Sequence, residues 1–311
     1  MSKKKIQNPK SSGLFRDSGK WAVILLLKAI ARLPFGCLYF LSDVLYLIIK
    51  DLVKYRSEVI TDNLIHAFPE KSASEILQLR NKFYRYFCDV SLESIKLYRL
   101  SEKELKKRVT FVGTETLNQL AEKRNGAILL AFHYNNWEWS GALQQQLNCK
   151  LLMVYNKMRD NEPMDDFLQK AREKWGGEAV KMGRAAKVTF RYFEQQKPVV
   201  LGLIADQSAL ASSPLWAVFM NREAAFFPGP VKIAQKTNQP VFFQHAKRLG
   251  RGKYEYSYSL LVEEPAQTDE REILLRYIEK MEEVIKSNPE YYLWSHKRWK
   301  HKRPQGTALI Q

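Results

Sequence analysis

Cysteine is scarce in this sequence, where Cys37, Cys88 and Cys149 are the three among 311 residues. They are far apart and include no C-x-x-C pair, which argues against a disulfide framework and a structural zinc site and favours a reducing, cytoplasmic-side location. Proline and glycine are also few, at 12 and 14, while 45% of the residues are apolar and 12% aromatic. This composition excludes disordered, collagenous and low-complexity proteins, and the length suits one large domain or two medium ones.

The common catalytic signatures are missing as well. The sequence contains no G-x-S-x-G elbow, no G-x-x-x-x-G-K-[ST] loop, no G-x-G-x-x-G turn and no H-E-x-x-H helix. Four of its five histidines, His66, His245, His296 and His301, have no metal-ligand spacing. We therefore expect neither a zinc enzyme nor a bound metal.

Acidic residues are outnumbered, since 50 Lys and Arg against 33 Asp and Glu leave a net charge of +17. Such a surface attracts nucleic acid, phosphorylated lipid head groups or an acidic protein. Residues 1–20 carry +5 and residues 295–311 carry another +5, so ten of the excess charges lie near the two ends. Charge alone does not choose among these partners.

The most hydrophobic part of the chain, residues 21–49, is interrupted by Lys28, Arg32, Pro34 and Asp43. Its longer piece, residues 35–49, would make a helix of about 22 Å, shorter than a hydrocarbon core of ~30 Å. No small-x-small cleavage site follows directly. Aromatic residues and flanking cations favour an interfacial or partly inserted helical anchor, with the body on the cytoplasmic side, over the alternative of a wall of the soluble core. We expect an anchoring segment at 1–56 and a catalytic domain at 57–311.

The rest of the chain alternates between short apolar runs and amphipathic helices. Ser72 and Glu75 have the spacing of a capping box at the start of a helix. Strands are expected at 110–112, 127–132, 151–155, 199–205, 241–246 and 254–262, and helices at 114–124, 136–147, 163–175, 185–195, after 228–230 and at 270–287. This alternation predicts an α/β fold with an open, mostly parallel sheet covered by helices on both faces, and a ligand site beyond the carboxyl ends of the strands.

His133 directly follows the expected strand at 127–132, and Glu138 lies five residues later. Five residues of regular helix rotate by about 140°, so the two side chains meet only if a turn separates the strand from a helix starting near Asn136. The carboxylate would then fix the histidine tautomer, and the helix N-terminus would offer N–H groups to an oxyanion. The spacing alone also fits a structural histidine and a solvated carboxylate.

His133-x4-Glu138, within HYNNWE, resembles the H-x4-[DE] motif of glycerolipid acyltransferases, in the form found in the late acyltransferases of lipid A biosynthesis. Further similarities follow in the same order over about residues 20–303. They are Asn63-Leu64, Phe68-Pro69-Glu70, Phe83-Tyr84-Arg85, Val154-Tyr155 with Lys157, Trp175-Gly176-Gly177, Ala205-Asp206-Gln207, Phe219 to Pro228-Gly229-Pro230, and the ending from Tyr292 to Lys300. Two departures are Asn135 and Asn221, where family members usually have Gly.

The resemblance implies transfer of a fatty acyl chain from an acyl-carrier-protein thioester to a hydroxyl of a phosphorylated lipid A precursor. The reaction would take place at the cytoplasmic face of the inner membrane of a Gram-negative bacterium, on an anionic membrane. By this hypothesis His133 is the general base and Glu138 orients and charges it. No cofactor is expected beyond acyl carrier protein or coenzyme A as the carrier of the co-substrate.

Other polar residues are expected to bind substrate. Asn136 belongs to the motif itself. Lys157, Arg159, Arg184 and Arg222 follow predicted strands or begin helices, so they are candidate phosphate contacts, although a solvated basic face explains them equally well. Asp206 follows the strand at 199–205 and would position a substrate hydroxyl or an arginine, or would cap a helix.

Two other functions also fit parts of the sequence. A phospholipid or aminolipid O-acyltransferase of the same superfamily differs only in the Asn136-Trp137-Glu138 and Trp294-to-Trp299 signatures. A basic, membrane-tethered nucleic-acid-binding protein would use the indoles and cations of residues 294–303. That second reading leaves His133 and Glu138 unexplained, so we expect no nucleic-acid partner.

Overall fold

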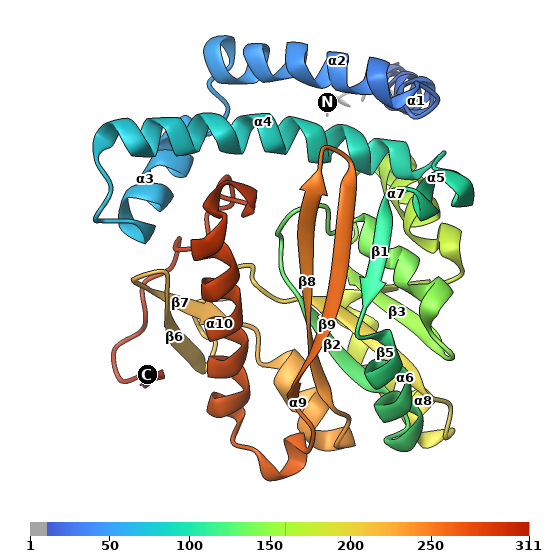
Figure 1. Cartoon of the computed structure of the whole chain (residues 1–311), viewed down its shortest axis with the longest axis vertical. Coiled ribbons are helices and arrows are strands. Elements are labelled where there is room, and N and C mark those ends of the chain that lie inside the picture. Colours follow the sequence, from blue (N-terminus) through green and yellow to red (C-terminus); the bar gives the residue numbers. More distant parts are fainter. Residues whose placement is uncertain (1–10, 159, 311) are drawn as a thin grey trace, which may run out of the picture.

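A seven-stranded sheet forms the centre of the computed structural model, which describes residues 11–158 and 160–310 (Figure 1). Its order is β1-β9-β8-β2-β5-β3-β4, and every neighbouring pair is parallel except β8 with β9. The strands are β1 (Val109–Val112), β2 (Ala127–Ala131), β3 (Lys150–Tyr155), β4 (Glu178–Lys181), β5 (Val199–Ile204), β8 (Val241–Gly250) and β9 (Lys253–Val262). The predicted α/β fold with a mostly parallel sheet is confirmed.

Helices cover both faces of this sheet. The first face packs against α6 (Thr114–Lys123), α7 (Glu162–Arg172) and the 3₁₀ helix η2 (Trp139–Gln146). The second face packs against α8 (Ala185–Glu194), α9 (Gly229–Thr237) and α10 (Glu270–Ser287). The strand register sets these faces, because Leu129 lies opposite Gly202 on the first face and Leu130 lies opposite Leu203 on the second. Shorter 3₁₀ turns are η3 (Glu173–Trp175), η4 (Met182–Arg184), η5 (Pro265–Gln267) and η6 (Pro289–Tyr291).

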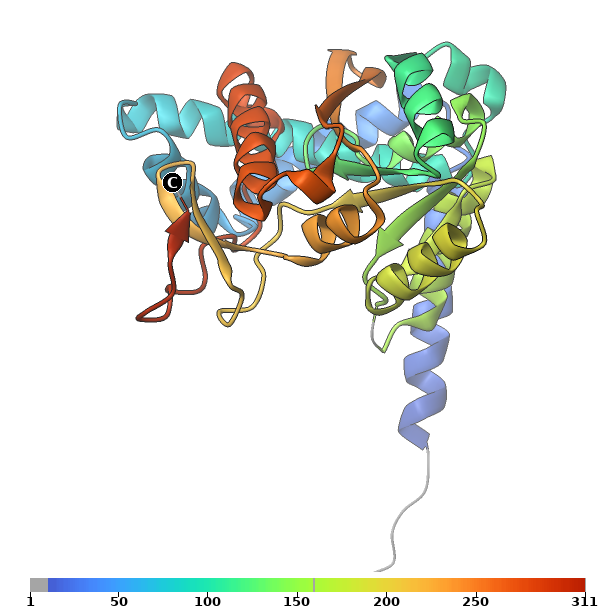
Figure 2. The same ribbon diagram turned by 90° about the horizontal axis from the view of Figure 1, so that it is seen from below.

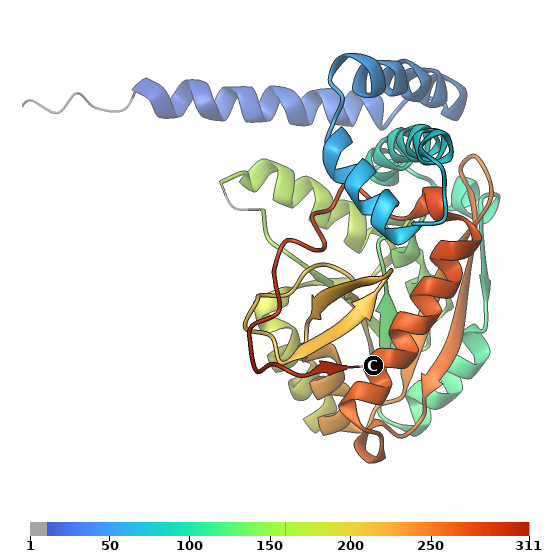
Figure 3. The ribbon, with the colours of Figure 1, turned by 90° about the vertical axis from the view of Figure 1, so that its left-hand side faces the viewer.

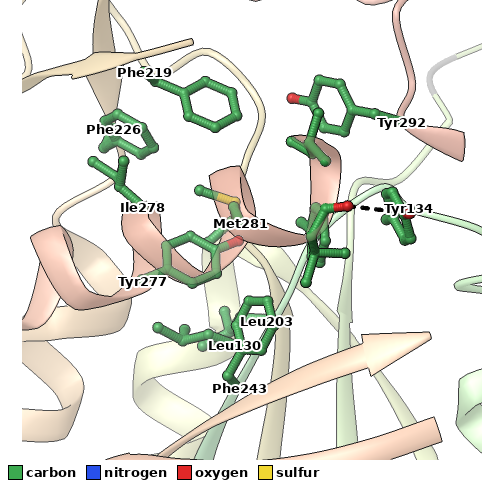
Figure 4. Close-up of a cluster of buried hydrophobic side chains, with 14 of the residues drawn as sticks. Leu130, Tyr134, Leu203, Phe219, Phe226, Phe243, Tyr277, Ile278, Met281 and Tyr292 are labelled. Carbon is green, nitrogen blue, oxygen red and sulfur yellow. Dashed lines mark hydrogen bonds between the residues drawn. The ribbon is translucent and has the colours of Figure 1, made fainter. Parts of the chain in front are cut away.

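Aromatic side chains fill much of the core on the second face. Figure 4 shows Leu130, Leu203 and Phe243 of the sheet facing Tyr277 and Met281 of α10. The Tyr277 hydroxyl donates to the carbonyl oxygen of Ala131 at 2.6 Å, which satisfies its one polar group. Large rings with satisfied hydroxyls thus hold α10 against the last residue of β2, next to His133.

A second, three-stranded sheet of β6 (Leu215–Phe219), β7 (Arg222–Phe226) and β10 (Leu309–Ile310) was not expected from the sequence, nor was β4. The β6–β7 turn is Met220-Asn221, with φ values of 48° and 65°. Two positive φ values are typical of the type I′ hairpin turn, whose usual sequence is Asn-Gly. Because Met-Asn lacks that signature, the hairpin gave no clear local signal.

The amino-terminal helices pack against the long helix α4 (Ala73–Leu97), and Figure 1 shows α2 running alongside it. They are α1 (Ser11–Ile30) and α2 (Phe35–Leu47), the latter continued by the π-helical turn η1 (Ile48–Leu52) and followed by α3 (Ser57–Ala67). Figures 2 and 3 show α1 reaching well beyond the body. Within residues 11–158 and 160–310, no helix has the length and apolar character needed to cross a bilayer.

Buried polar contacts hold α2 on α4. The Tyr39 hydroxyl donates to Glu93 at 2.9 Å, and the Ser42 hydroxyl donates to Asp89 at 2.7 Å. Arg251 of the β8–β9 connection contacts the same Asp89 carboxylate at 2.6 Å. The segment is therefore tied to the body, while a domain boundary near residue 56 stays a prediction.

Most helix boundaries agree with the predicted ones. The Ser72–Glu75 capping box is present at the start of α4, and α10 has the expected bounds. A short α5 (Glu102–Lys106) precedes β1. The helix expected at 136–147 is instead the 3₁₀ helix Trp139–Gln146, so the turn after His133 is three residues longer than predicted.

Candidate active site

The loop between β2 and η2 carries the HYNNWE motif, and backbone hydrogen bonds to the carboxyl-terminal region hold it in place. The Leu293 N–H donates to the carbonyl oxygen of His133 at 3.1 Å, and the Asn135 N–H donates to that of Tyr291 at 3.0 Å. The Tyr86 hydroxyl donates to the carbonyl oxygen of Asn135 at 2.8 Å. Two distant parts of the chain, the carboxyl-terminal region and α4, thus fix the conformation of this loop.

Asn135 occupies a position where family members usually have Gly, and its φ is 50°. Asn221, the other departure, has φ 65°. Glycine reaches positive φ without a steric cost, and Asn is among the residues that tolerate it best. The Asn135 amide also donates to the carbonyl oxygen of Ala246 at 2.7 Å. Asparagine therefore adopts a positive φ at both positions, as glycine would.

Asp206 holds the imidazole of His133. Its Oδ1 lies 2.7 Å from His133 Nδ1, and the carboxylate is almost fully buried. Burial alone would raise the pKa of Asp206, but the charge and hydrogen bond of His133 outweigh it, so the pKa lies below the usual value. An ionised carboxylate at Nδ1 fixes the tautomer with the proton on Nδ1 and leaves the Nε2 lone pair free to accept a proton. Neither of the roles predicted for Asp206 included this one.

Gln207 stands at the other ring nitrogen, with its Nε2 3.2 Å from His133 Nε2. The side-chain amide is placed to donate to the lone pair that a substrate hydroxyl would use. The Trp137 ring packs edge-on against the imidazole, with 5.0 Å between centroids. The sequence motif around Ala205 and Asp206 contained Gln207, but its contact with His133 depends on the packing of β5 beside β2.

Glu138 lies beside His133, but it does not orient the imidazole. Its two carboxylate oxygens accept from Arg172, at 2.7 Å from Nη2 and 2.9 Å from Nε. Burial would raise the pKa of Glu138, and the charges of Arg172 and His133 lower it below the usual value. The predicted orienting role is therefore wrong, because the bidentate arginine takes both oxygens and Asp206 takes Nδ1. Glu138 still lines the same cavity as His133, and the two side chains interact through space.

Sequence reasoning missed Arg172 entirely. It lies in the last turn of α7, next to the Trp175-Gly176-Gly177 motif. A single arginine at a helix end looks like an ordinary favourable charge at the negative end of the dipole. Only the packing of α7 against the motif loop reveals that it neutralises Glu138.

Asn136 is fully buried, and its side chain binds protein groups instead of facing the cavity. Its Nδ2 donates to Glu93 at 2.8 Å, and its Oδ1 accepts from the Trp139 N–H at 3.2 Å. The predicted substrate contact is replaced by a structural role, in which Asn136 joins the motif loop to α4. Because the Asn136 side chain accepts from the Trp139 N–H, this helix N–H is not available to the oxyanion that the sequence analysis expected it to bind.

The predicted basic contacts are dispersed. Lys157 is half-exposed and lies 4.0 Å from Glu162. Arg184 is exposed at the end of η4, and Arg222 pairs with Asp62 at 2.8 Å beside Trp299. Arg159 lies outside the described residues. Arg172 and Arg56 line the two hollows that contain His133, whereas Lys157, Arg184 and Arg222 line neither.

Two hollows meet at His133. The first, of about 270 Å³, extends from His133 and Glu138 under η2 along the first face of the sheet, and Leu129, Leu143 and Leu151 line its inner part. The second, of about 460 Å³, shares His133 and Glu138. Its lining includes the polar residues Arg56, Ser91, Ser94 and His296. The imidazole therefore stands where a cavity with polar groups at its mouth and leucines at its inner end meets a second hollow with several polar residues in its lining.

The aromatic and basic ending is largely part of the core. Trp294 is fully buried, and its carbonyl oxygen accepts from the Asn63 amide at 2.8 Å. Arg298 is 1% exposed and lies over the Phe226 ring at 4.3 Å, with Nη1 donating to the carbonyl oxygen of Ala225. These indoles and cations do not form the exposed stacking surface on which the nucleic-acid alternative depended.

In the part of the chain that the structure describes, His, Cys, Asp and Glu side chains form no group of three or more suited to a metal ion.

Comparison with known proteins identifies the family of this chain. A family model described as bacterial lipid A biosynthesis acyltransferase matches residues 7–301. A lipid A biosynthesis acyltransferase of Haemophilus influenzae is 22% identical over 281 residues, which cover 89% of this chain and 86% of that protein. A lipid A biosynthesis lauroyltransferase of Escherichia coli K12 is 24% identical over 294 residues, 92% of each chain. The chain belongs to the bacterial lipid A biosynthesis acyltransferase family and is an acyltransferase.

Proposed function

We propose that this enzyme transfers a fatty acyl chain from an acyl-carrier-protein thioester to a hydroxyl of a lipid A precursor, with His133 as the general base. The observation that carries the proposal is the His133 imidazole, which Asp206 holds at Nδ1 and which lines both the cavity with the leucine inner end and the second hollow. Family membership supplies the acyl-transfer chemistry and the lipid A context.

In the proposed reaction, His133 Nε2 removes the proton of the acceptor hydroxyl while the oxygen attacks the thioester carbonyl carbon. The ester bond forms, the carbon–sulfur bond breaks, and the leaving thiolate takes the proton back from the imidazolium. Asp206 and Glu138 both carry negative charge near the ring and stabilise the imidazolium. The step needs no nucleophile from the protein, because the acceptor oxygen attacks directly.

The first cavity suits the acyl chain of the donor. Leu129, Leu143 and Leu151 line it and are each at most 3% exposed, so a chain entering from His133 would lie in a dry, narrow space. The second hollow leaves room for hydroxyl and phosphate groups, with Arg56 among its lining residues.

The amino-terminal helices are the proposed contact with the cytoplasmic face of the inner membrane. Trp21, Leu25 and Leu26 of α1 and Phe40 and Leu47 of α2 are all more than half exposed. Apolar side chains on a helix flanked by cations favour insertion into an anionic membrane interface. The net charge of +17 would also attract an acidic acyl carrier protein.

Mass spectrometry of lipid A from cells with and without this protein tests the function. Loss of one acyl chain from lipid A is expected, and its mass identifies the chain. Unchanged lipid A with an altered phospholipid profile would indicate a phospholipid or aminolipid acyltransferase instead.

A purified-enzyme assay tests the base. His133→Ala is expected to abolish acyl transfer from the thioester while the protein stays folded and membrane-bound. His66→Ala is a matched control, because His66 is half-exposed and pairs with Asp62 on α3. Normal turnover of His133→Ala would disprove the mechanism.

A further inference from the structure

A third cavity, of about 190 Å³, lies on the opposite face of the sheet from the first. It lies between the strands β3 and β5 and the helices α8 and α9, and its lining is mostly apolar. Members of that lining include Ala185, Leu203, Phe227 and Ile233. The hydroxyl chemistry proposed above does not use it.

The first and third cavities approach each other at the carboxyl ends of β3 and β5. Both are lined by Tyr155, Ile204 and Gln207, although they lie on different faces of the sheet. The Gln207 amide is the group that lies 3.2 Å from His133 Nε2. The apolar third cavity and the first cavity, which is apolar at its inner end, therefore both end beside the atom that is proposed to remove the proton.

Small residues make the third cavity possible. Ala185 and Ala186 begin α8, and Gly229 begins α9, where an added Cβ would meet no atom within 4 Å. Protein interiors are normally close-packed, and an unfilled apolar space costs stability. The lining of this cavity is apolar except for a few polar groups, among them the amides of Asn156 and Gln207. Such a cavity suits an alkyl chain.

We propose that this third cavity binds an alkyl chain of the acceptor lipid, while the first binds the acyl chain of the donor. The inference rests on the proposed function, in which both substrates carry alkyl chains. The sheet separates the two chains, and each would bring its reacting end to His133 from a different face.

The assignment follows from how each cavity is closed. The inner part of the first is formed by residues at most 3% exposed, which suits a single chain delivered end-on by a thin carrier arm. The third is lined by Met182, which is 47% exposed. A lipid with a large head group can insert a chain only where the cavity reaches the surface, so the third cavity fits the acceptor.

Two substitutions fill one cavity each. Ala186→Trp places an indole at the exposed edge of the third cavity, and Gly202→Val adds a side chain to the first, where a Cβ meets its nearest atoms at 3.5 Å or more. Ala186→Trp is expected to raise KM for the lipid acceptor by about tenfold with KM for the acyl-thioester unchanged. Gly202→Val is expected to raise KM for the long-chain donor instead.

A binding measurement gives a readout independent of turnover. The fluorescent fatty acid cis-parinaric acid is expected to bind the wild-type protein at two sites and each filled variant at one. The inference is wrong if Ala186→Trp leaves the acceptor KM unchanged and still binds cis-parinaric acid at two sites. It is also wrong if Ala186→Trp raises the donor KM instead of the acceptor KM. If the wild-type protein transfers acyl chains but binds cis-parinaric acid at one site, the inference about the third cavity is wrong and the proposed function still holds. If the wild-type protein transfers no acyl chain, the proposed function itself is wrong.

Discussion

His133 Nδ1 lies 2.7 Å from Asp206 Oδ1, although the two residues are 73 positions apart in the chain. They follow β2 and β5, which are parallel neighbours, with Ala131 opposite Ile204. Side chains beyond the carboxyl ends of neighbouring parallel strands meet at one edge of a sheet. The base and its partner are therefore positioned by the register of two central strands.

Asp206→Asn is expected to lower kcat by about 10²–10⁴ with little change in KM, because the amide no longer enforces a protonated Nδ1 or stabilises the imidazolium. Steady-state kinetics and the ¹⁵N NMR signals of His133, which distinguish the tautomers, measure the two effects. Asp269→Asn is the control, since Asp269 caps α10 and Asn caps helices equally well. An unchanged kcat and tautomer in Asp206→Asn would contradict the positioning role.

Glu138→Ala is expected to abolish acyl transfer and leave the protein folded and membrane-bound. Arg172→Ala is expected to destabilise the protein by about 1–3 kcal/mol, because it leaves the largely buried carboxylate without its partner. The double variant should lose less stability than the two single losses combined, as for any pair in direct contact. Urea unfolding of the four proteins measures this coupling, and strictly additive losses would show that the bidentate pair contributes nothing.

Replacing exposed leucines of α1 by charge is expected to weaken membrane binding without affecting folding. Leu25→Glu and Leu26→Glu should each reduce binding to vesicles containing phosphatidylglycerol by about tenfold, because each removes apolar surface from the proposed interface. Val112→Glu is the control, since Val112 is half-exposed at the end of β1. Equal vesicle binding by all variants would rule out this face of α1.

His296 lines the second hollow beside His133, and burial lowers its pKa to about 4. An unfolded histidine has a pKa of about 6.5, so between about pH 6.5 and 4 the unfolded state binds more protons than the folded state. The free energy of unfolding should therefore fall as the pH falls through that window. His296→Asn should show a smaller fall, measured by urea unfolding at pH 7 and 4.5, and identical falls would show that His296 does not contribute.

The strand before His133, the capping box at Ser72 and the last helix at 270–287 could all be predicted, because each depends on residues close together in the sequence. The hairpin of β6 and β7 could not, since its turn uses Met220-Asn221 without the usual glycine. The helix expected from Asn136 begins three residues later, because the Asn136 side chain binds Glu93 and the Trp139 N–H.

Local sequence patterns are enough to predict the α/β fold, the histidine at the end of a buried strand and the resemblance to an acyltransferase family. They do not identify the carboxylate that contacts the histidine, which depends on how the strands pack. The five-residue spacing favoured Glu138, but Glu138 binds Arg172 and the partner is Asp206. The physical reason is that hydrogen bonds across a sheet depend on strand order and register, and contacts from neighbouring strands are not encoded in local spacing.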